Sequence, residues 1–190
     1  MAAPRNDNIR EKILEAAAAL LSEKAFPEIS LSDIARQSRI SKGTLYYYYN
    51  NKDDILFDVA SAYLDRLSHD LDVWVNDRSK DTSLHRLCNY TLQRGAFDES
   101  GAVRLYLLGA AVSGHAELRA RLIERYNGFK ETLRTCVAAR AAHSDSEFTA
   151  WMLLTVMDGI LVQSQLQNPD FDAQSFIAKA VALLTAQAGG

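Results

Sequence analysis

Long proline-free stretches with helical periodicity dominate this sequence. The 190 residues include three prolines, Pro4, Pro27 and Pro169, and each lies where an apolar repeat begins or ends. Proline disrupts helix interiors, so its absence between these positions favours long helices. The alternation typical of strands is absent throughout. The sequence therefore predicts an all-α fold of about nine helices.

Apolar residues recur at spacings of three and four, which is typical of amphipathic helices. A first helix is expected from Asp7 to Lys24, and a long one from Lys52 to Asp77 with Asn51 as its N-cap. Later helices are expected at 82–97, 102–113, 116–142, 147–167 and 173–188. Short breaks rich in Gly, Ser, Asp and His separate these segments.

Two short helices are expected between the first helix and the long one. Ser30 can cap a helix that carries Asp33 at its third position, and Ser41 can cap the next. Only residues 38–40 link the two. Two short helices joined by such a turn, behind a longer supporting helix, form a helix-turn-helix, whose second helix can enter the major groove of DNA.

Charge and reactive residues narrow the possible functions. The formal net charge is −3, so affinity for a polyanion must come from a local arrangement. Cys88 and Cys136 lie far apart, and the four histidines lack the spacing of metal ligands. We expect no catalytic residues, no metal and no cofactor. No signal peptide or membrane span is apparent, and a cytoplasmic protein is expected.

Three runs of residues form a specific pattern between positions 9 and 57. They are Ile34-Ala35, SKGTLY at 41–46 and YYNNKDDIL at 48–56. This pattern resembles the DNA-binding part of the tetracycline-repressor (TetR) family of bacterial regulators. The family usually has Gly at the position of Arg39 and an aromatic-His-Phe run at 47–49, so Arg39 is expected in a left-handed or bridge conformation.

The resemblance implies two domains. Residues 1–51 would form the helix-turn-helix domain, and residues 52–190 would form a helical domain for effector binding and dimerisation. The segment 150–167 is apolar on more than one face, so we expect it to pack against its own subunit and a second copy. The last helix carries a matching stripe that includes Phe176, Ile177 and Val181. The last two helices of each subunit would form the homodimer interface.

The second short helix contains the residues expected to bind DNA. Gly43 has no side chain to hold the backbone away from DNA, and Thr44 offers a hydroxyl and a methyl group to a base. Lys42 and Lys52 lie near helix N-termini, where they can hold phosphates. Ser32 can reach a base or a phosphate.

The four consecutive tyrosines cannot share one role, because neighbouring helical residues point about 100° apart. Leu45 and Tyr49 share the inward face, so Tyr49 is expected in the core. By resemblance, Tyr46 and Tyr48 are expected to contact phosphates and Tyr47 to face a base. A structural role as half-buried amphipathic residues is the alternative, although four in a row cannot all be buried.

The resemblance also implies a small-molecule effector between the middle helices. Candidate pocket residues are aromatic, sulfur-containing and polar side chains on inward stripes: Trp74, Cys88, Tyr106, Tyr126, Trp151, Met152 and Thr155. Asp158 is expected to be a hydrogen-bonded structural group, with a ligand contact as the alternative. The function expected is that of a dimeric repressor released from a palindromic operator by its effector. The alternatives are an activator of the same architecture and a helical ligand-binding or scaffold protein that never touches DNA.

Overall fold

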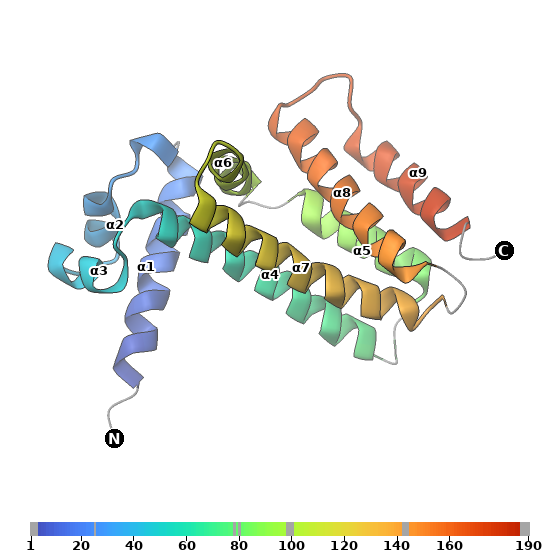
Figure 1. Ribbon diagram of the computed structural model, residues 1–190, viewed down its shortest axis with the longest axis horizontal. Coiled ribbons are helices and arrows are strands. Elements are labelled where there is room, and N and C mark those ends of the chain that lie inside the picture. Colours follow the sequence, from blue (N-terminus) through green and yellow to red (C-terminus); the bar gives the residue numbers. More distant parts are fainter. Residues whose placement is uncertain are drawn as a thin grey trace.

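A small group of N-terminal helices joins a larger helical body through one long helix (Figure 1). A computed structural model describes residues 4–24, 26–77, 79, 81–97, 101–141 and 145–186. Within those residues the regular structure is entirely helical, as predicted. The helices are α1 (Pro4–Glu23), the 3-10 helix η1 (Phe26–Glu28), α2 (Leu31–Gln37), α3 (Lys42–Tyr48), α4 (Lys52–Asn76), α5 (Leu84–Ala96), α6 (Gly101–Val112), α7 (Ala116–Ala138), α8 (Ser146–Gln165) and α9 (Ala173–Ala186).

The predicted helix caps of the N-terminal part are confirmed. Ser30 and Asp33 form a reciprocal capping box at the start of α2. The side chain of Ser41 accepts a hydrogen bond from the Thr44 amide at the start of α3, and Asn51 caps α4 in the same way. Each cap satisfies a backbone donor that the first turn of a helix leaves without a partner.

Arg39 occupies the turn between α2 and α3 in a left-handed conformation, with a φ of 57°. Glycine is the residue that adopts this region without penalty, and a side chain there costs about 1–2 kcal/mol. The amide of the next residue, Ile40, returns to the carbonyl of Ala35 at 3.0 Å. The left-handed conformation expected for Arg39 is therefore confirmed.

The long helix α4 contributes to three cores. Ile55 and Val59 are buried with residues of α1, α2 and α3. Leu56 is buried with residues of α6 and α7, and Leu71 belongs to the largest core. The predicted domain boundary at residue 52 coincides with the first residue of α4, whose opening turns pack in the N-terminal core. A shift of α4 must therefore disturb both parts.

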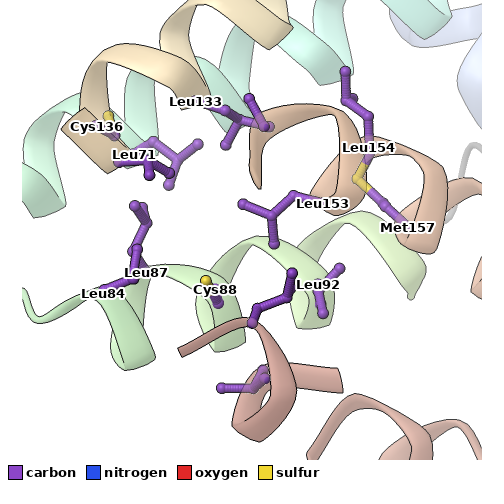
Figure 2. Close-up of a cluster of buried hydrophobic side chains, with 14 of the residues drawn as sticks. Leu71, Leu84, Leu87, Cys88, Leu92, Leu133, Cys136, Leu153, Leu154 and Met157 are labelled. Atoms are coloured by element: carbon purple, nitrogen blue, oxygen red, sulfur yellow. The ribbon is translucent and has the colours of Figure 1, made fainter. Parts of the chain in front are cut away.

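The largest core lies between α4, α5, α7, α8 and α9, and Figure 2 shows part of it. Its labelled residues are Leu71, Leu84, Leu87, Cys88, Leu92, Leu133, Cys136, Leu153, Leu154 and Met157. Gly95 of α5 faces α8 so closely that an added Cβ would lie 1.9 Å from Met157 Sδ. A side chain at this position would therefore force the buried Met157 side chain to move.

The predicted ends of the later helices need small corrections. Helix α7 ends at Ala138, where the prediction extended it to residue 142, because a turn at Ala139 and Arg140 follows. Residue 142 lies outside the described part, as do the last residues predicted for α9. Along the described chain, every helix is too short or too polar to cross a bilayer.

Candidate functional site

The outer face of α3 is unusually aromatic. Tyr46 and Tyr47 are 54% and 77% exposed, and Tyr48 is half-buried with its ring edge against Tyr47 at 5.3 Å between centroids. Tyr49 is only 5% exposed and belongs to the N-terminal core. The predicted core position of Tyr49 is therefore confirmed. Tyr46 and Tyr47 lie on the surface, and Tyr48 packs partly against the N-terminal core.

The first turn of α3 is open to solvent. Lys42 and Gly43 are exposed, and Ser32 is exposed at the matching position of α2. Thr44 is half-buried, and its hydroxyl lies 2.8 Å from Ser41 Oγ. A Cβ added to Gly43 would meet only Ser41 Oγ, at 3.7 Å. The fold itself therefore does not require glycine there, and a need for it would come from a partner that approaches the backbone.

Lys52 has a role inside the domain that the sequence did not indicate. Its Nζ donates to the carbonyl oxygen of Ile29 at 2.8 Å. This bond ties the start of α4 to the residue just before the cap of α2. The ammonium group is therefore held against the protein backbone, and the predicted phosphate contact of Lys52 remains a prediction.

Asp58 of α4 fixes the end of α3. Its Oδ2 accepts hydrogen bonds from Tyr49 Oη at 2.8 Å and Arg10 Nη2 at 2.7 Å. Arg10 Nε also donates to Tyr49 Oη at 3.2 Å. Burial raises the pKa of Tyr49 to about 12, so the phenol stays a neutral donor at neutral pH. Helices α1, α3 and α4 thus meet at one carboxylate.

The seven expected effector residues do not share one cavity. Cys88 is fully buried in the largest core, and Met152 packs against the same core. Tyr106 is 38% exposed, with its hydroxyl 3.5 Å from Asp53 Oδ1. Trp151 and Thr155 point outward from α8.

Trp74 lies elsewhere, stacked on Tyr90 at 5.5 Å between centroids. The two rings line an open surface groove of about 420 Å³.

Tyr126 alone of the seven lines the enclosed cavity between α4, α6 and α7. That cavity has a volume of about 20 Å³, enough for one water molecule. Its other lining residues are Phe57, Ala60, Ser61, Leu64, Arg104, Leu107, Leu108, Leu122 and Arg125. The cavity is apolar except for one serine, the Tyr126 phenol and two arginines. The two arginines, Arg104 and Arg125, were not among the residues expected from the sequence.

A buried ion pair lies beside this cavity. Arg104 is 5% exposed, and its Nη2 donates to Asp158 Oδ1 at 3.0 Å. Tyr126 Oη donates to the same oxygen at 3.1 Å. Burial raises the pKa of Asp158, against the opposing effect of Arg104, and raises that of Tyr126 to about 12. The hydrogen-bonded role expected for Asp158 is confirmed.

Arg125 completes the polar part of the cavity. Its Nη2 donates to the carbonyl oxygen of Ser61 at 2.7 Å and pairs with Asp65. Its Nε is buried without a hydrogen-bond partner in the described part of the chain. An unsatisfied buried donor is unfavourable, so an acceptor that reached this nitrogen would stabilise it.

Helix α8 also has an exposed apolar stripe. At spacings of three and four, the residues exposed to solvent are Phe148, Trp151, Thr155, Gly159 and Val162 of α8 and then its C-cap, Leu166. On α9, Phe176 and Leu183 are exposed, whereas Ile177 and Val181 are buried in the subunit's own core. The stripe expected on α9 therefore lies partly in the core of this chain. Trp151 and Thr155 lie on the outer face of α8, and their expected place in an effector pocket remains a prediction.

The described residues contain no group of three His, Cys, Asp or Glu side chains arranged to hold a metal ion.

Two family models match this chain. Residues 13–59 match the model of bacterial regulatory proteins of the tetR family. Residues 81–189 match the model of the BetI-type transcriptional repressor C-terminal domain. MftR of Mycobacterium tuberculosis, whose name describes a transcriptional regulator of mycofactocin biosynthesis, is 29% identical over 156 residues, covering 80% of this chain and 77% of MftR.

Two solved structures share the fold at low identity. FadR of Bacillus subtilis in complex with stearoyl-CoA has a TM-score of 0.70 at 19% identity, covering 92% of this chain and 96% of FadR. A transcriptional regulator from Saccharomonospora viridis in complex with choline has a TM-score of 0.75 at 17% identity, covering 95% and 97% of the two chains. The likeness extends over both parts of the molecule.

Proposed function

Because this chain belongs to the TetR family of bacterial transcriptional regulators, we propose that it is a repressor that binds a palindromic operator as a homodimer and leaves it when a small effector binds. The observation that carries the proposal is the outer face of α3. There, Lys42, Gly43 and Tyr47 are exposed on a short capped helix that Leu45 and Tyr49 anchor in the core.

Recognition of DNA follows from the chemistry of this face. Tyr47 is the most exposed tyrosine of α3, and its position suits contact with base edges in the major groove. Lys42 and the phenols of Tyr46 and Tyr48 suit phosphates, which set the register of the protein without reading sequence. Gly43 lets the DNA backbone approach the start of α3 closely.

Dimerisation through α8 and α9 is supported by the exposed apolar stripe of α8. Scattered apolar residues are normal on a protein surface, but a continuous stripe along a helix is typical of an interaction site. A two-fold dimer would present its recognition helices to two half-sites about 34–36 Å apart.

The effector is proposed to enter between α4, α6 and α7. The cavity there is mostly apolar, and Arg125, one of its lining residues, has a buried Nε donor without a hydrogen-bond partner in the described part of the chain. The cavity volume is far below the roughly 300–1,000 Å³ of ordinary ligand sites, so a ligand must push these helices apart. Stearoyl-CoA and choline in the related structures support a small-molecule effector.

A shift of α4 caused by the effector would change the spacing of the recognition helices. A coupling free energy of about 1–3 kcal/mol is sufficient to alter operator occupancy.

Selection of DNA from a random duplex library tests the proposal. We expect enrichment of a palindrome whose half-sites lie one helical turn apart, with binding that weakens steeply as salt rises. A scaffold or ligand-binding protein that never touches DNA would enrich no sequence. A reporter carrying the selected site upstream of its promoter then separates a repressor from an activator by the sign of the change in expression.

Replacing Tyr47 by alanine should alter sequence preference more than overall affinity. Loss of one base contact is expected to reduce discrimination by about 1–3 kcal/mol at the affected position. Lys42→Ala is the comparison, because loss of a phosphate contact should weaken binding to all duplexes equally and reduce the salt dependence. Both variants are measured against the selected duplex and its single-base variants. Unchanged preference in the Tyr47 variant would refute the assigned role.

A further inference from the structure

Arg121 of α7 contacts the opening turns of α4 at two carboxylates. Its Nη1 lies 2.6 Å from Asp54 Oδ1, and its Nη2 lies 3.9 Å from Asp58 Oδ1. The guanidinium also lies over the ring of Phe57, at 3.8 Å from the centroid. Only arginine has a planar fork that can reach two acceptors while it stacks on a ring.

The second oxygen of each carboxylate accepts a hydrogen bond from the segment between the recognition helix α3 and α4. Asp58 Oδ2 accepts from Tyr49 Oη at 2.8 Å, and Tyr49 is the C-cap of α3. Asp54 Oδ2 accepts from Asn51 Nδ2 at 2.9 Å, and Asn51 is the N-cap of α4. Each carboxylate therefore joins α7, through one oxygen, to the short segment between α3 and α4.

We propose that Arg121 is a positioning residue that couples α7 to the recognition helix, chiefly through Asp58 and Tyr49. The inference rests on the proposed function, because it supplies the route by which an effector at α7 would reach α3. Leu122, Arg125 and Tyr126, which line the cavity, follow Arg121 within two turns of the same helix. A ligand that displaces this part of α7 also displaces Arg121.

The Asp58 route has the longer contact with Arg121, 3.9 Å compared with 2.6 Å for Asp54, but it is the more buried of the two. The side chain of Asp58 is 14% exposed, compared with 31% for Asp54, so solvent screens its interactions less. Tyr49 is fixed by the N-terminal core and cannot follow Asp58 by swinging its ring into solvent. A shift of Asp58 therefore moves the end of α3 or breaks the bond to Tyr49.

Hydrogen exchange of the free protein tests the coupling. In Arg121→Gln, amides 45–49 should exchange about 2- to 5-fold faster, the range expected for loss of a partly exposed ion pair. The ion pairs and the ring contact of Arg121 are with residues of α4, so a purely local role would leave these amides unchanged. Arg119→Gln is the matched control, since it removes the same charge from an exposed position of α7 and should leave them unchanged.

A double variant decides whether the effect passes through Tyr49. Tyr49→Phe removes the hydroxyl that Asp58 accepts from. If the route is correct, Arg121→Gln and Tyr49→Phe together accelerate exchange by less than the product of their separate effects. Multiplicative effects, or faster exchange confined to α7 and the start of α4, would overturn the inference.

Operator affinity provides the second measurement, on the duplex selected by the wild-type protein. Arg121→Gln is expected to weaken binding about 3- to 10-fold relative to Arg119→Gln at an equal melting temperature, an order of magnitude typical of modest coupling. Equal affinities of the two variants would count against the coupling. Failure of the wild-type protein to select any duplex would refute the proposed function instead, while the exchange data would still decide the coupling.

Discussion

Glutamate at position 159 is expected to convert the protein into a monomer and to lower its operator affinity at least ~100-fold, the scale of gain that two linked binding sites provide. Gly159 lies within the exposed stripe of α8, between Thr155 and Val162. A Cβ added there meets no atom of its own subunit within 4 Å. The subunit fold should therefore tolerate the substitution, which also removes a glycine from a helix interior.

In a dimer built on this stripe the same carboxylate would be buried without a partner, at a cost of several kcal/mol. Sedimentation velocity gives the oligomeric state, and titration of the selected duplex gives the affinity. Gly128→Glu is the matched control, because Gly128 is an exposed helical glycine of α7 with equally open surroundings. A Gly159→Glu protein that remains dimeric would show that α8 does not form the interface.

Local features of this fold were predictable from the sequence because they depend on neighbouring residues. The caps at Ser30, Ser41 and Asn51 need only a side chain and an amide three residues ahead. The left-handed backbone of Arg39 was expected from the resemblance to the TetR family, which usually has Gly at this position. Tyr49 was placed in the core because it shares a helix face with Leu45.

Contacts between distant segments were not predictable from helical periodicity, which identifies the buried face of a helix but not the helix that covers it. Lys52 was assigned to phosphate from its place at a helix N-terminus, yet it donates to Ile29, 23 residues away. The bond from Arg10 to Asp58 spans 48 residues. Both contacts became visible only once the helices were packed.

For a related reason, helical periodicity did not show how the seven residues expected to line the effector pocket are distributed among the core, a surface groove and the outer face of α8. Helix α8 is apolar on most of its circumference, so spacing alone could not separate the side chains that face the core from Trp151 and Thr155, which face outward. The sequence did contain an unused signal. Arg104 is the single charged residue of α6, and Asp158 is the single charged residue of α8 beyond its first turn. Lone charges on two apolar helices are favourable when they pair.

Removing the carboxylate of Asp158 is expected to lower the free energy of unfolding by about 3 kcal/mol. Loss of one partner from a buried ion pair commonly costs about 3–5 kcal/mol, because it leaves the other charge uncompensated. The lower end applies here, since the Asp158 side chain is 30% exposed whereas that of Arg104 is 5% exposed. Chemical denaturation of Asp158→Ala at a fixed protein concentration measures the loss.

Asp158→Asn separates charge from hydrogen bonding in the same measurement. The amide oxygen can still accept from Arg104 and Tyr126, so this variant should lose less stability than Asp158→Ala. Equal losses would show that the negative charge, and not the acceptor, balances Arg104. Losses below about 0.5 kcal/mol in both variants, the range of ordinary surface substitutions, would contradict the role of the ion pair.

Because the ion pair joins α6 to α8 beside the cavity lined by Arg104 and Tyr126, an effector that opens this cavity must either preserve the bond from Arg104 to Asp158 or replace it with an acceptor of its own.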